Sequence, residues 1–167
     1  MIKEVTGDIL LTKAQAIAHG VGPNDHFDSG LALSLRKDYP SMAKDFRYYC
    51  KVYNPHPGDA WMWGGVGGVR IINLLTQEPS KTAGGHPGEA TLPNLNHSLK
   101  KLVQIVKEEG ITSLAIPKLA TGYGKLDWEE VKPMIYQRLE ELDIPVYLYS
   151  LYRKGIQAEE TELQVAS

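Results

Sequence analysis

The sequence has little of what marks several specialised classes of protein. It contains one cysteine, Cys50, so no disulfide can form within the chain. No apolar run approaches the length of a membrane span, and the N-terminus, MIKEVTGDILL, does not have the basic-then-apolar layout of a signal peptide. These absences predict a cytoplasmic protein in a reducing compartment, with no membrane partner.

Neither sign of charge dominates. The chain has 18 basic and 20 acidic residues, a net charge of −2, so contact with DNA would have to come from a local patch or from a base. His, Cys and carboxylate residues show no spacing typical of metal ligands, and we expect neither a metal nor a cofactor. A length of 167 residues, 43% of them hydrophobic, fits one domain with a sizeable core.

The most informative stretch is LAIPKLATGYGKLDW, residues 114–128. It opens with an apolar run typical of a buried strand and closes with the start of a helix. In the loop between them, Gly122 and Gly124 flank Tyr123, which would allow positive φ and bring backbone N–H groups close to a ligand. The pattern predicts a diphosphate site, and a tight strand-to-helix turn is the alternative left open.

A second loop has a similar setting. The strand-like AIAHGV, residues 16–21, runs into a polar segment, and a helix begins at Leu31, so a second anion site is predicted there. His19 lies in the apolar strand, where a core position is commoner than a chemical role. Asp8 follows Gly7, where it could cap a turn or accept from the amine of a purine.

Strands and amphipathic helices alternate along the chain, which predicts a three-layer α/β/α domain. The glycines at 64–68 connect two strands and indicate a hairpin, and residues 77–90 form a long irregular loop. We assign the domain to residues 1–156 and expect 157–167 to be a polar tail or linker, frayed and removable. The expected strands cover 2–5, 16–21, 60–63, 69–76, 111–117 and 145–151. One expected helix begins at 31, two cover 40–53 and 128–142, and another is capped by residues 91–94 and runs to about 109.

Four segments carry a resemblance that spans nearly the whole chain. GDIL at 7–10, AIAHGV at 16–21, SGLA at 29–32 and PKLATGYGKLDWEEV at 117–131 resemble the macrodomain family of ADP-ribose binders. The resemblance implies a macrodomain fold with a mixed central sheet. Within the family, the chain is most similar to terminal ADP-ribose glycohydrolases, especially the antitoxin macrodomains of the DarT/DarG type. In such pairs the toxin attaches ADP-ribose to thymidine in single-stranded DNA and the macrodomain removes it.

The resemblance also implies a ligand and the residues that bind it. ADP-ribose or ADP-ribosylated DNA would be the ligand, and a cognate ADP-ribosyltransferase toxin is a candidate partner. An aspartate of the family binds the adenine amine, a first loop lines the diphosphate and distal ribose, and a second loop holds the phosphates. The matching positions are Asp8 and Ile9, then Ser29, Gly30 and Leu31, then Thr121, Gly122, Tyr123 and Gly124.

Lys81 matches the lysine that works in the glycohydrolase branch with an aspartate of the second phosphate loop. That aspartate is replaced here by Gly124 or Lys125. We expect a protonated Lys81 to stabilise the departing thymine, in preference to attacking the anomeric carbon as an amine, and Asn24 to contact the thymine imide. Two other functions share the site: a reader that binds ADP-ribose without chemistry, and a hydrolase of ADP-ribose on protein carboxylates.

Overall fold

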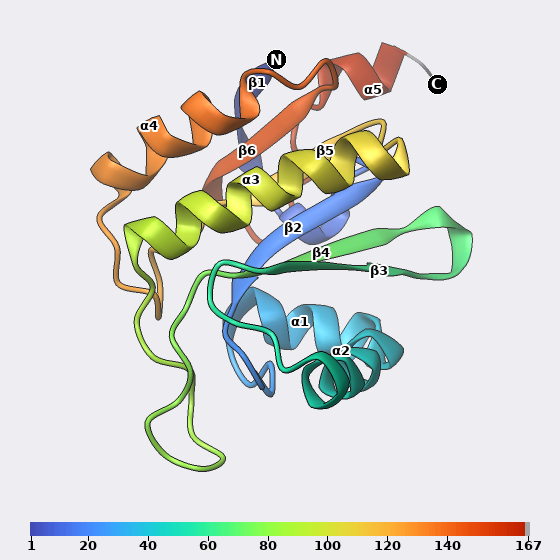
Figure 1. Cartoon of the computed structure of the whole chain (residues 1–167). Helices are drawn as coiled ribbons and strands as arrows, with labels where there is room; N and C mark the ends of the chain where they lie inside the picture. Colours follow the sequence, from blue (N-terminus) through green and yellow to red (C-terminus); the bar gives the residue numbers. More distant parts are fainter. Residues whose placement is uncertain (166–167) are drawn as a thin grey trace.

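The computed structural model describes residues 1–165 and contains a six-stranded mixed sheet between two layers of helices (Figure 1). The strand order is β1-β6-β5-β2-β4-β3, and every neighbouring pair is parallel except β3 and β4. The predicted three-layer α/β/α fold with a mixed sheet is confirmed. The strands are β1 (Ile2–Gly7), β2 (Ala16–Val21), β3 (Ala60–Gly64), β4 (Arg70–Leu75), β5 (Leu114–Pro117) and β6 (Val146–Tyr152).

The helices cover opposite faces of the sheet. Helices α1 (Gly30–Asp38) and α2 (Pro40–Tyr53) lie on one face, and α3 (Leu92–Glu109) and α4 (Trp128–Leu139) lie on the other (Figure 1). Between them and the sheet are two apolar clusters, one on each face. Three short helices complete the chain: the 3₁₀ segments η1 (Ile9–Leu11) and η2 (Val66–Gly68), and α5 (Thr161–Val165).

Local capping explains why α3 was predicted at both ends. The side chain of Thr91 accepts a hydrogen bond from the Asn94 N–H at 3.1 Å, which caps the start of α3. Gly110 ends the helix in the left-handed conformation, with φ of 63°. The Ile111 N–H then donates to the Val106 carbonyl, so the connection extends further than predicted and β5 begins at Leu114 instead of residue 111.

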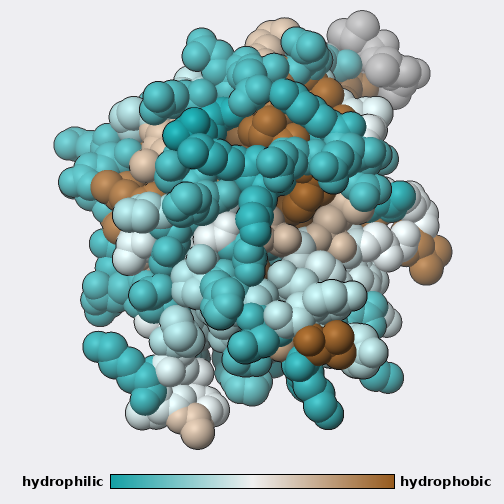
Figure 2. All heavy atoms as spheres, in the orientation of Figure 1, coloured by the Kyte–Doolittle hydropathy of each residue, from teal (hydrophilic) through white to brown (hydrophobic). Residues whose placement is uncertain are grey.

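The polar outer surface agrees with this layered core. In Figure 2 hydrophilic side chains cover most of the visible face, and apolar residues appear in small separate patches. Within residues 1–165, no helix has the length and apolar character needed to cross a membrane.

The C-terminal segment corrects one expectation. Residues predicted to be frayed instead lie against the domain, where Ala158 and Glu160 are buried, with 2% and 1% of their surface exposed. The Glu160 carboxylate accepts hydrogen bonds from the Tyr149 hydroxyl (2.7 Å), the Lys13 N–H (2.8 Å) and the Thr12 hydroxyl. The polar composition of this segment therefore gave no indication that Ala158 and Glu160 are buried against the domain. Residues 166 and 167 of the predicted tail lie outside the described residues.

Candidate functional site

Two cavities lie where the carboxyl ends of the parallel strands meet. The first, here called the Tyr123 cavity, has a volume of about 220 Å³ and is lined by the loops that follow β2, β4 and β5. The second, the Asp8 cavity, measures about 430 Å³ and is lined by the ends of β1 and β6 and by α1. Gly30, Leu31 and Pro117 line both cavities. The two cavities are therefore neighbouring parts of one groove at the edge of the sheet, the usual ligand position in parallel α/β folds.

Asp8 has a structural role and also faces the groove. One carboxylate oxygen accepts from the Leu10 N–H at 3.0 Å and caps η1, and the other accepts from the Gly155 N–H at 2.9 Å. The cap predicted from the sequence is confirmed. Asp8 and Ile9 both line the Asp8 cavity, and each carboxylate oxygen keeps a second lone pair that can accept from a ligand.

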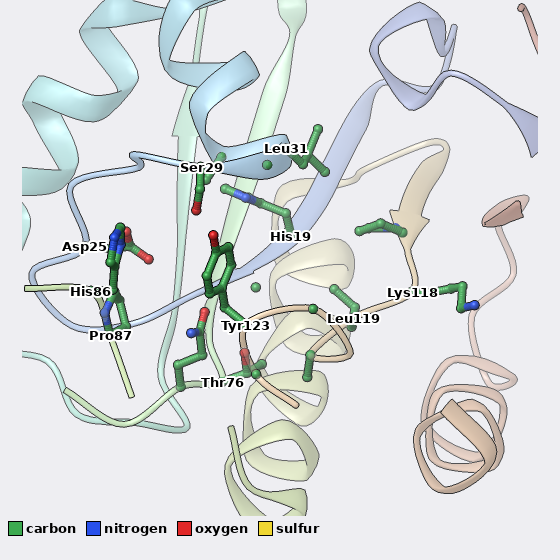
Figure 3. A pocket seen from close by; sticks show the side chains of 18 of the residues that line it. His19, Asp25, Ser29, Leu31, Thr76, His86, Pro87, Lys118, Leu119 and Tyr123 are labelled. Carbon is green, nitrogen blue, oxygen red and sulfur yellow. The ribbon is translucent and has the colours of Figure 1, made fainter. Parts of the chain in front are cut away.

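The first predicted loop leads into the N-terminus of α1. Ser29 precedes the helix, and its side chain makes no capping hydrogen bond to the helix backbone. The Ser29 side chain lines the Tyr123 cavity, as do Gly30 and Leu31 (Figure 3). The start of α1 thus presents its free N–H groups beside a hydroxyl that is available to a ligand.

The second predicted loop supplies the opposite wall. Gly122, Tyr123 and Gly124 line the Tyr123 cavity, but neither glycine has a positive φ, and the left-handed residues are Ala120 (φ 63°) and Lys125 (φ 62°). The positive φ expected at Gly122 and Gly124 was therefore wrong. Gly124 is instead required by a close approach, because a Cβ atom there would lie 2.6 Å from the Ala120 carbonyl oxygen.

This second loop is joined to the long loop that follows β4. The Tyr123 and His86 rings are stacked, with centroids 5.8 Å apart and planes at 15°. The Ala90 N–H donates to the Gly124 carbonyl at 3.0 Å, and Lys125 lies 3.5 Å from Glu89. In Figure 3 the hydroxyl end of Tyr123 points towards Ser29 across the cavity. The two loops consequently form a single wall opposite α1.

Comparison with known proteins assigns the family. The family model "Macro domain" matches residues 14–135. The chain belongs to the macrodomain family. It is 29% identical over 157 residues to a DNA ADP-ribosyl glycohydrolase of Mycobacterium tuberculosis, covering 88% of this chain and 42% of that protein. It is 33% identical over 151 residues to the ADP-ribose glycohydrolase OARD1 of Bos taurus, covering 90% and 91%.

Solved macrodomains have the same fold. The macrodomain of Thermus aquaticus DarG superposes with a TM-score of 0.80 at 25% identity, over 90% of this chain and 98% of that one. The macrodomain of Mycobacterium tuberculosis DarG gives 0.79 at 27% identity, over 89% and 97%. The chain spans about two fifths of the length of the mycobacterial relative, so the comparison concerns this macrodomain alone.

Three predicted site residues do not line the groove of this macrodomain. Lys81 is exposed, because residues 80–85 fold into a local turn in which the Ser80 hydroxyl donates to the Thr82 carbonyl at 2.6 Å. Asn24 is exposed, with φ of 59°, and the Thr121 hydroxyl donates to the Lys118 carbonyl at 2.8 Å. Neither cavity includes these three among its lining residues, and their roles toward a ligand stay predictions.

For two of the three, a residue close by in the sequence lines the Tyr123 cavity instead. Asp25 does so in place of Asn24, and Gln77 in place of Lys81. Gln77 follows the end of β4, and its side-chain amide donates to the Gly88 carbonyl at 3.0 Å, within the loop that carries Lys81. Position just after a buried parallel strand was the signal that could have identified Gln77. The other lining residues that we did not predict as site residues are His19, Gly20, Asp28, Ala32, Thr76, His86, Pro87, Pro117, Lys118, Leu119 and Ala120.

His19 has the core position that the sequence favoured. Its ring is 2% exposed, and its Nε2 atom lies 2.7 Å from the Asn73 Oδ1 atom. Burial lowers the pKa of His19 to about 4, although the hydrogen bond to Asn73 opposes the shift. The ring also lines the Tyr123 cavity, where at neutral pH it is uncharged and shapes the wall without donating a proton. Within residues 1–165, no group of three or more His, Cys, Asp and Glu side chains is placed to hold a metal ion.

This burial predicts an acid-dependent loss of stability. The unfolded chain takes up a proton at His19 near pH 6.5 and the folded protein only near pH 4, so acid favours unfolding. The contribution of neutral His19 to the free energy of unfolding is fully present above pH 6.5. It falls by about 3 kcal/mol as the pH drops to 4. Urea unfolding of wild type and His19→Gln across this range should show a flatter dependence in the variant, and equal slopes would contradict the assignment.

Proposed function

We propose that this macrodomain is an ADP-ribosyl glycohydrolase that removes ADP-ribose from thymidine in single-stranded DNA, as the antitoxin of a toxin–antitoxin pair. An ADP-ribosyltransferase toxin is its proposed partner and the cytoplasm its proposed location. Support comes from the relatives, which include DNA ADP-ribosyl glycohydrolases and a Thermosipho africanus protein named as a DNA ADP-ribosyl transferase fused to a DNA ADP-ribosyl glycohydrolase.

The observation that carries the proposal is the continuity of the two cavities. ADP-ribose has an adenosine and a distal ribose joined through a diphosphate. The groove offers a carboxylate, Asp8, at one end and an aromatic wall, Tyr123, at the other. Gly30 lies between them at the N-terminus of α1, where free N–H groups favour an anion. These features support binding of ADP-ribose along the groove, with the adenine towards Asp8 and the distal ribose towards Tyr123.

The placement of Lys81 supports a second candidate, a reader that binds ADP-ribose without cleaving it. Lys81 is exposed and is not among the residues that line either cavity, so the cation predicted to stabilise the leaving base is not part of the groove wall. Lys118 lines the Tyr123 cavity, but its ammonium lies over the Trp128 ring, 5.4 Å from the centroid. A reader needs only the binding groove, so both functions predict affinity for ADP-ribose.

The deciding experiment measures release of free ADP-ribose from two substrates. One is single-stranded DNA carrying ADP-ribose on thymidine, and the other is a protein carrying it on carboxylates. Release from the DNA is the expected result. Cleavage of the protein adduct alone would assign the third function, and calorimetric binding of ADP-ribose without release from either substrate would assign the reader.

Lys81→Ala tests the catalytic lysine separately. Removal of one charge that stabilises the transition state lowers kcat by roughly 10² to 10⁴, so a catalytic role for Lys81 predicts a loss of this size. Because the side chain is exposed and outside the groove, we expect a change of no more than about threefold. A loss of two decades or more would show that Lys81 enters the groove when substrate binds.

A further inference from the structure

Asp25 places a carboxylate in the Tyr123 cavity. It lies in the loop between β2 and α1, and its side chain extends towards the space between Ser29 and Tyr123 (Figure 3). The loop is held in place by Phe27, which is fully buried against Phe46, with ring centroids 5.0 Å apart. The carboxylate is therefore carried by an anchored segment, next to residues expected to surround the distal ribose.

The hydrogen bonds of Asp25 orient the carboxylate without neutralising it. One oxygen accepts from the Phe27 N–H at 2.9 Å and the other from the Gly22 N–H at 3.1 Å. Asp25 forms no ion pair with any of residues 1–165, whereas the neighbouring Asp28 pairs with Arg36 at 3.0 Å. Each Asp25 oxygen keeps a lone pair for one further donor, and a water molecule bound in the cavity is such a donor.

We infer that Asp25 is the general base of the hydrolysis, an inference that rests on the proposed function. Its carboxylate takes a proton from a water molecule whose oxygen bonds to the anomeric carbon of the distal ribose. The bond from that carbon to the thymine nitrogen breaks, and its electron pair leaves with the nitrogen. The proton then passes to the departing base, so one water yields free ADP-ribose and unmodified thymidine. Asp25 thus supplies from the first loop the carboxylate that the second loop lacks.

The surroundings of Asp25 suit a base. Burial, the largest influence, raises the pKa of its carboxyl above the ordinary aspartate value, and the charge of Asp28 adds to the rise, while the two backbone N–H bonds and His26 oppose it. The other titratable groups near it are Cys50 from α2 and, around the cavity, His19, His86, Lys118 and Tyr123. A carboxylate with a raised pKa binds a proton more strongly than an ordinary aspartate does, which favours its acting as a base.

The test compares Asp25→Asn and Asp25→Ser with wild type on thymidine-ADP-ribosylated DNA. Both replacements keep a side-chain oxygen that can accept from the Phe27 N–H, so the turn is retained while the base is lost. We expect kcat to fall by about 10² to 10⁴, with ADP-ribose affinity changed by less than about threefold. The wild-type rate should fall in acid, with a midpoint above the pKa of an ordinary aspartate. This acid-dependent fall in rate should be absent in both variants.

A matched control variant and a measurement of ADP-ribose affinity separate failure of the Asp25 inference from failure of the proposed function. Asp38→Asn changes an exposed aspartate at the end of α1 and should leave kcat unchanged. Wild-type cleavage that persists in both Asp25 variants would overturn the inference and leave the proposed function standing. A fall in ADP-ribose affinity as large as the fall in kcat would also overturn it, because it would assign Asp25 to the shape of the loop. Absence of cleavage by wild type would instead refute the proposed function.

Discussion

Replacing Glu160 with alanine should lower the melting temperature of this macrodomain by about 6 to 12 °C. The carboxylate is 1% exposed and accepts hydrogen bonds from Tyr149, Lys13 and Thr12, so its loss leaves three donors without a partner. At about 1 kcal/mol for each hydrogen bond, the cost is about 3 kcal/mol, and a chain of this size loses about 2 to 4 °C per kcal/mol. Calorimetric melting measures the change directly.

The same replacement should weaken ADP-ribose binding, because Glu160 anchors the segment that supports the Asp8 cavity. Tyr149 lines that cavity, and the Asp8 carboxylate accepts from the Gly155 N–H of the same C-terminal segment. Glu160→Gln keeps the shape and an oxygen acceptor and should lose less than half as much stability. Glu159→Ala changes the exposed neighbour of Glu160 and should have the melting temperature of the wild type. Equal melting of the Glu159 and Glu160 variants would show that the C-terminal segment does not anchor the domain.

Glu160 also shows why the sequence predicted the helices better than the C-terminus. Helix α2 was predicted at both ends because its signals are local: Pro40 at the first turn and aromatic residues repeating at the helical period. The burial of Glu160 depends on residues about 150 positions away, Thr12 and Lys13, and polar composition gives no sign of such partners. Short-range patterns were sufficient for the layers of the fold and insufficient for this contact.

In the groove, the sequence likewise places residues at strand ends better than residues within loops. Asp8 and Ile9 follow a strand directly, and both line the Asp8 cavity. Lys81 lies six residues beyond the end of β4, in the turn of residues 80–85, and is not among the residues that line either cavity. Asn24 and Asp25 are adjacent, yet one faces solvent and the other faces the cavity. Loop residues are placed by backbone hydrogen bonds and long-range anchors, which spacing in the sequence does not reveal.

The second phosphate loop allows a paired test of where the diphosphate binds. A Cβ atom added to Gly122 would have no other atom within 4 Å, and the residue has no positive φ, so alanine fits there in the free protein. Gly122→Ala should therefore keep the wild-type melting temperature. The added methyl group would lie on the wall of the groove, where a diphosphate close to the backbone N–H groups leaves no room. Overpacking costs about 1 to 3 kcal/mol, so ADP-ribose affinity should fall roughly 5- to 150-fold by calorimetry.

Gly124→Ala should behave differently, because its Cβ would lie 2.6 Å from the Ala120 carbonyl oxygen, a backbone atom that cannot rotate aside. The loop must shift, so we expect both a lower melting temperature, by about 2 to 12 °C, and weaker binding. Gly64→Ala, at the opposite edge of the sheet where a Cβ meets only ordinary contacts with Arg70, measures the effect of the methyl group away from the groove. If Gly122→Ala binds ADP-ribose as tightly as Gly64→Ala does, the diphosphate does not lie against this loop and must be held at the N-terminus of α1 alone.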